Sequence, residues 1–90
     1  MCGIIGYVGE KPAVEIIKAS LIRLEYRGYD SAGIATFSGS SIHVCKDKGM
    51  VAEVIKQCSS TNLPGNIGIG HVRWATHGGV TRENAHPHCD

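Results

Sequence analysis

The strongest constraint on the fold is the order in which strand-type and helix-type segments alternate along the 90 residues. Residues 3–9 form a short run of apolar residues and glycines, which is typical of a buried strand. The β-prone runs 32–37 and 42–46 are joined by the short polar segment 38–41 and predict an antiparallel hairpin. Residues 67–72 form a further strand that is interrupted by glycines.

Two helices are predicted between these strands. The first begins at Pro12, whose fixed φ suits the first helical turn, and ends around residues 25–28. Each helix carries an apolar stripe at helical spacing: Ala13, Ile17, Leu21 and Leu24 in the first, and Val51, Val54, Ile55 and Cys58 in the second. The order of strand, helix, hairpin, helix and strand predicts an α+β fold in which helices cover one face of a mostly antiparallel sheet.

Composition excludes several classes of function. The net charge is +1 and the nine basic residues are scattered singly, so no field attracts nucleic acid. No window approaches the roughly 20 apolar residues of a membrane span. Residues 4–10 lack the basic flank of a secretory signal. We therefore expect a cytoplasmic protein that binds neither nucleic acid nor membrane.

The four cysteines, Cys2, Cys45, Cys58 and Cys89, could in principle form two disulfides. Because no export signal is apparent, reduced thiols are the simpler expectation. On the strand and helix patterns, Cys45 is then an ordinary strand residue and Cys58 an ordinary core residue.

Cys2 is the first candidate for chemistry because it directly follows the initiator Met1. Removal of Met1 would give one residue both a thiol, with a pKa near ~8.5, and an α-amine, with a pKa near ~8. The amine could accept the proton of the thiol and later return it to a leaving group, so Cys2 would supply both nucleophile and base. The alternative is a small buried cysteine without a chemical role.

A second candidate site lies in residues 70–79, Gly-His-Val-Arg-Trp-Ala-Thr-His-Gly-Gly, and continues to residues 84–88. Arg73 offers a planar guanidinium, which suits the α-carboxylate of an amino-acid substrate. Thr76 and His77 add short hydrogen-bond donors, and the two glycines that follow would allow the loop to move as a lid.

A metal site is the competing interpretation of this region. Five side chains are possible ligands: His71, His77, His86, His88 and Cys89. Their spacing matches no zinc pattern, since it contains neither a Cys-x-x-Cys pair nor a helical His-x-x-x-His pair. We therefore predict no metal and no cofactor.

Three ordered motifs resemble a known family. They are Met-Cys-Gly-Ile-Ile-Gly at residues 1–6, Leu-Glu-Tyr-Arg-Gly-Tyr-Asp-Ser-Ala-Gly-Ile-Ala at 24–35, and Gly-His-Val-Arg-Trp-Ala-Thr-His-Gly at 70–78. Together they are similar to the class II glutamine amidotransferases, which are N-terminal-nucleophile hydrolases with a four-layer α/β/β/α fold. The resemblance implies that residues 1–90 are the N-terminal part of such a glutaminase domain, so that the sandwich is incomplete in this chain.

The resemblance also implies how the reaction would begin. Cys2 would attack the side-chain amide of glutamine, form a glutamyl thioester and release ammonia. Arg27 and Gly28, which by themselves are typical of a polar turn, would lie near the amine of Cys2 and orient it.

Substrate binding would fall to five residues of the second candidate site. Arg73 would bind the α-carboxylate of glutamine, with Thr76 and His77 helping. Trp74 would shape the exit for ammonia, and His86 matches the family's histidine near the substrate pocket.

Within the class, Tyr29, Trp74 and the run Asn-Ala-His-Pro-His at 84–88 favour the branch that transfers ammonia to fructose-6-phosphate. In that branch the acceptor binds a separate isomerase domain, and the complete enzyme is expected to be a homo-oligomer. Neither that domain nor the Asn-Gly pair of the family's oxyanion hole occurs in these residues, and losing one oxyanion donor alone costs about 10²–10³ in rate. The chain by itself is therefore expected to be inactive. The alternatives are another ammonia acceptor, or a non-catalytic module that binds glutamine or a partner chain.

Overall fold

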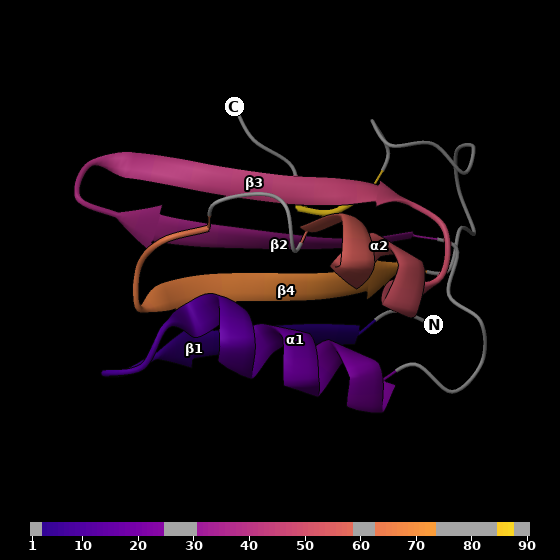
Figure 1. Ribbon diagram of the computed structural model, residues 1–90, viewed down its shortest axis with the longest axis horizontal. Coiled ribbons are helices and arrows are strands. Elements are labelled where there is room, and N and C mark those ends of the chain that lie inside the picture. Colours follow the sequence, from indigo (N-terminus) through magenta and orange to yellow (C-terminus); the bar gives the residue numbers. More distant parts are fainter. Residues whose placement is uncertain (1–2, 25–30, 59–62, 74–84, 88–90) are drawn as a thin grey trace.

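The computed structural model describes residues 3–24, 31–58, 63–73 and 85–87, and Figure 1 shows its architecture. The elements follow the predicted order: β1 (Gly3–Val8), α1 (Ala13–Leu24), β2 (Ser31–Ser38), β3 (Ser41–Lys48), α2 (Val51–Cys58) and β4 (Ile67–Arg73). The predicted α+β class is confirmed, because the strands form one sheet and the helices pack on it.

The four strands lie in the order β1-β4-β2-β3, and every neighbouring pair is antiparallel. The hairpin of β2 and β3 is tighter than predicted, since Ser38 pairs with Ser41 and leaves a turn of two residues. Gly39 allows this turn because its φ of 62° lies in the left-handed region, which glycine adopts without steric cost.

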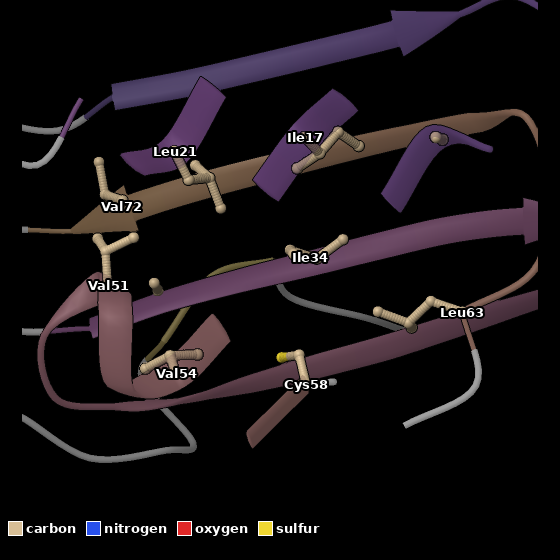
Figure 2. Packing of buried hydrophobic residues seen from close by; sticks show 10 residues of the cluster. Ile17, Leu21, Ile34, Val51, Val54, Cys58, Leu63 and Val72 are labelled. Atoms are coloured by element: carbon tan, nitrogen blue, oxygen red, sulfur yellow. The ribbon is translucent and has the colours of Figure 1, made fainter. Parts of the chain in front are cut away.

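Both helices cover the same face of the sheet, as the sequence predicts (Figure 1). α1 packs on β1 and β4, α2 packs on β2 and β3, and the two helices contact one another. Figure 2 shows the core between these layers. It contains residues of both predicted stripes, residues at alternate strand positions, and Leu63 from the segment before β4. The full set is Ala13, Ile17, Leu21, Ala32, Ile34, Val51, Val54, Cys58, Leu63 and Val72.

Glycines in β4 let α1 approach the sheet closely. A Cβ on Gly70 would overlap the side chain of Ile17 and would lie 3.3 Å from Cδ1 of Leu21. A Cβ on Gly68 would lie 2.8 Å from Cδ1 of Ile17. Gly68 and Gly70 therefore allow the close packing of α1 on β4, because a side chain at either position would push the helix away from the strand.

The expectation of reduced cysteines is wrong for one pair, since Cys45 and Cys58 form a disulfide with their Cα atoms 5.8 Å apart. Cys45 pairs with Ile34 and so lies on the helix-covered face of β3, while Cys58 ends the buried stripe of α2. Each assignment was correct by itself, but the packing of α2 on β3 brings the two sulfurs together. The bond links the edge strand of the sheet to the helical layer.

The opposite face of the sheet carries several large apolar side chains that are exposed. Its large exposed side chains are Ile4, Val8, Phe37, Ile42, Ile67 and Ile69. These residues alternate along the strands with the positions that face the helices, as expected for a sheet that has apolar residues on both faces. We call them the open face.

Within the described residues, neither helix has the length and apolar character needed to cross a bilayer.

Candidate functional site

The candidate site lies at the end of the sheet where β1 begins and β4 ends. Gly3, the residue that follows Cys2 in the chain, pairs with Val72, and the next residue of β4, Arg73, pairs with Ser31 of β2. The antiparallel register thus brings the start of two strands and the end of a third to one place. Arg73 is only 9% exposed there.

Arg73 and His71 lie on the face of the sheet away from the helices. Alternate residues of a strand share a face, and Gly70 and Val72 are the positions that meet α1 and the core. The Ser31 hydroxyl, cross-strand from Arg73, is fully buried and makes no hydrogen bond with the described part of the chain.

A cross-strand row runs through His71. His71 of β4 pairs with Gly33 of β2, and Gly33 in turn pairs with Lys46 of β3. The central member of the row has no side chain, so a gap opens between an imidazole on one side and a lysine on the other.

The segment 85–87 fills this gap. A Cβ on Gly33 would overlap the carbonyl oxygen of His86, so glycine is required for the segment to lie this close to the sheet. Ala85 is completely buried and Pro87 is also buried, while His86 is half-buried. The peptide bond between His86 and Pro87 is cis.

Two contacts hold the segment from either side. The rings of His71 and His86 stack with their centroids 4.2 Å apart and an angle of 30° between their planes. The Lys46 ammonium donates a hydrogen bond to the Pro87 carbonyl oxygen, with 2.9 Å between Nζ and O. A hydrogen bond from a charged donor is stronger than one between neutral groups.

Two of the predicted site residues are described, and the structure places both on one face of the sheet. They are Arg73, at the end of β4, and His86, which reaches that face through its stack on His71. The other predicted site residues, Cys2, Arg27, Gly28, Trp74, Thr76 and His77, lie outside the described residues.

Sequence reasoning missed the contacts of three residues of this candidate site: Gly33 and Lys46, which contact the segment 85–87, and His71, which stacks on His86. The alternation of β4 could have placed His71 on the face of Arg73, since the two are separated by one residue. Lys46 gave no comparable signal, because its partner Pro87 is 41 residues away.

The candidate metal ligands are only partly described, since His77, His88 and Cys89 lie outside the described ranges. Within those ranges, no group of three or more histidine, cysteine, aspartate or glutamate side chains could hold a metal ion. The chemistry available on this face is that of a guanidinium, an ammonium and two stacked imidazoles, which suits anionic and hydrogen-bonding groups.

Comparison with known proteins places this geometry in context. A scan against models of protein families found no match. A relative from Pyrococcus horikoshii named glutamine–fructose-6-phosphate aminotransferase (isomerizing) is 57% identical over 90 residues. The match covers 100% of this chain and 15% of the relative, so the chain spans less than a sixth of the length of that protein.

Two solved structures share the fold. The structure of the allosteric regulatory enzyme of purine biosynthesis matches with a TM-score of 0.81 at 33% identity, covering 97% of this chain and 18% of that chain. The structure of glutamine phosphoribosylpyrophosphate amidotransferase from B. subtilis matches with a TM-score of 0.79 at 31% identity and the same coverage. By sequence over its whole length and by fold, the chain therefore belongs to the class II glutamine amidotransferases.

Proposed function

We propose that residues 1–90 form the N-terminal part of a glutaminase domain that releases ammonia from glutamine for transfer to fructose-6-phosphate. The observation that carries this proposal is the identity of 57%, over every residue, to a protein named glutamine–fructose-6-phosphate aminotransferase. Identity to the phosphoribosylpyrophosphate amidotransferase is lower, at 31%. The similarity of fold to that enzyme favours a second candidate, a class II amidotransferase with another acceptor. The higher sequence identity favours fructose-6-phosphate as the ammonia acceptor.

The proposed reaction begins at Cys2 after removal of Met1. The thiol transfers its proton to the α-amine of the same residue, and the sulfur attacks the side-chain amide carbon of glutamine. Collapse of the adduct breaks the carbon–nitrogen bond, the amine returns the proton, and ammonia leaves. Water then hydrolyses the thioester to glutamate and frees the sulfur. Arg27 and Gly28 would orient the amine of Cys2.

Arg73 would bind the α-carboxylate of glutamine. Its position supports this role, because it ends β4 beside the strand that Cys2 leads into, and its guanidinium is mostly shielded from water. A shielded guanidinium binds a carboxylate more strongly than an exposed one does. Thr76 and His77 would complete the contacts, Trp74 would shape the ammonia exit, and His86 would border the pocket.

The open face supports the proposal that these residues are only part of a domain. A soluble domain rarely leaves so many large apolar side chains of one sheet in water, and such a surface normally packs on another layer. In an α/β/β/α sandwich that layer is a second sheet. We propose that the remainder of the glutaminase domain covers the open face, and that residues 1–90 alone do not hydrolyse glutamine.

Intact mass and labelling of the complete native protein test the function. We expect Met1 to be absent and a diazoketone analogue of glutamine to modify Cys2, while Cys45 and Cys58 stay unmodified. Cys2→Ala should abolish glutamine hydrolysis. Retained Met1, or modification of Cys45 in place of Cys2, would contradict the proposal and favour a non-catalytic binding module.

Comparing ammonia acceptors separates the two enzymatic candidates. We expect fructose-6-phosphate to consume the ammonia and phosphoribosylpyrophosphate to leave it unused. The reverse result would assign the chain to another branch of the class.

A further inference from the structure

We propose that Lys46 is a positioning residue of the glutamine site: together with Gly33 and His71 it seats the segment 85–87 on the sheet and thereby fixes the imidazole of His86. This inference rests on the proposed function, which gives His86 its place at the substrate pocket. It adds to that function a set of three residues, on the neighbouring strands β4, β2 and β3, that hold the segment in place.

Gly33 provides the seat. It is buried at the centre of the cross-strand row, and the carbonyl oxygen of His86 occupies the space that a side chain would fill. The fit is tight on the other side as well, since a Cβ at this position would lie 2.8 Å from Cβ of Lys46. Gly33 therefore sets how closely the segment approaches the sheet.

Lys46 locks the backbone of the segment. Its Nζ lies 2.9 Å from the Pro87 carbonyl oxygen; Lys46 is half-buried and Pro87 is buried. A charged donor on a neutral acceptor forms one of the stronger hydrogen bonds, and partial burial strengthens it further. The disulfide at the neighbouring Cys45 ties the same strand to α2, so the lysine projects from an anchored strand.

His71 holds the ring. The stack of His71 and His86 restrains the imidazole plane, while Lys46 restrains the backbone one residue later. The three restraints come from β4, β2 and β3, on consecutive positions of one row. Without Lys46 the restraint on the Pro87 carbonyl would be lost, and the His86 ring could rotate or withdraw with the segment.

Positioning of this kind matters because small displacements at a reactive site are costly. A misplacement of about 1 Å can lower the rate by about 10²-fold. Lys46 touches the segment and not the substrate, so we expect a smaller loss. Lys46→Met should lower kcat/KM for glutamine about tenfold, mostly through KM, as for loss of one pocket contact.

The test compares three variants of the complete native protein. Lys46→Met removes the donor, Lys46→Arg keeps a cationic donor of similar reach, and Lys56→Met is the matched control, because Lys56 is exposed on α2. Glutamine hydrolysis is one measurement. The second is the pair of ring-proton NMR signals of His86, which reports the seat of the imidazole without any substrate.

We expect Lys46→Met to shift the His86 signals and lower kcat/KM, and Lys46→Arg and Lys56→Met to match the wild type in both. Normal hydrolysis and unshifted His86 signals in Lys46→Met would overturn this inference alone. An equal loss of kcat/KM in Lys56→Met would also overturn the inference, because the loss would then be a general effect of removing a lysine. A wild-type protein that does not hydrolyse glutamine would overturn the proposed function, and this inference with it.

Discussion

The imidazole rings of His71 and His86 stack at a centroid distance of 4.2 Å, although 15 positions separate them in the sequence. His71 belongs to β4, one of the two inner strands of the described sheet, whereas His86 belongs to the segment 85–87, which lies over Gly33 on the same face of the sheet. The stack therefore joins the frame of the sheet to a residue that we place at the substrate pocket.

A double-mutant cycle measures this stack. Stacked aromatic pairs contribute about 0.5–1.5 kcal/mol beyond the area they bury. We expect a coupling free energy in that range between His71→Ala and His86→Ala, from urea unfolding of the single and double variants. A parallel cycle that pairs His43→Ala with His86→Ala is the control. His43 lies on the helix-covered face of β3, opposite to the face that carries His86. A coupling near zero for His71 and His86 would contradict the stack.

Gly70 tests how closely α1 packs on the sheet. Gly70→Ala would force a methyl group into Ile17, and overpacking of this kind costs about 1–3 kcal/mol of unfolding free energy. Gly6→Ala is the matched control, because a Cβ on Gly6 would meet no atom within 4 Å. The control should leave stability unchanged or raise it by about 0.4–1 kcal/mol, since alanine restricts the unfolded chain. Equal effects of the two changes would argue against close contact of α1 with β4.

Reduction of the disulfide tests the correction to the expected cysteine chemistry. The bond joins residues 13 positions apart, and closing a loop of about this size stabilises a protein by about 3 kcal/mol in the chain-entropy model. We expect reductant to lower the unfolding free energy by about that amount. The double variant Cys45→Ala/Cys58→Ala should not respond to reductant. Peptide mapping without reductant should recover the two residues linked, and free thiols at both would contradict the bond.

Most of the fold could be predicted from sequence because local patterns decided it. Each apolar stripe of α1 and α2, and each β-prone run of the hairpin, lies within a short stretch of the sequence. Each element formed where its pattern lies. The strand order could not be predicted in the same way. Insertion of β4 between β1 and β2 depends on which distant strands pair, and no local pattern encodes that choice.

The site was predictable to a smaller extent. Arg73 and His86 were predicted as site residues because their motifs resemble a known family, and chemistry alone suggested only Arg73 as a carboxylate partner. Lys46 contacts Pro87 and Gly33 contacts His86, each more than 40 positions away along the chain, so single-sequence patterns carry no signal for these contacts. The Cys45–Cys58 bond was missed for the same reason: each cysteine fitted its own element, and only packing joined them.

Arg73→Lys in the complete native protein tests the proposed carboxylate clamp. A lysine keeps the charge but cannot form two parallel hydrogen bonds with a carboxylate, and one bond to a charged group is worth about 1.5–3 kcal/mol. We therefore expect KM for glutamine to rise about 10-fold or more with a smaller change in kcat, since the α-carboxylate is bound equally in the ground and transition states. Arg23→Lys, at an exposed position of α1, is the control for loss of a guanidinium. An unchanged KM in Arg73→Lys, with normal folding, would remove Arg73 from the substrate site.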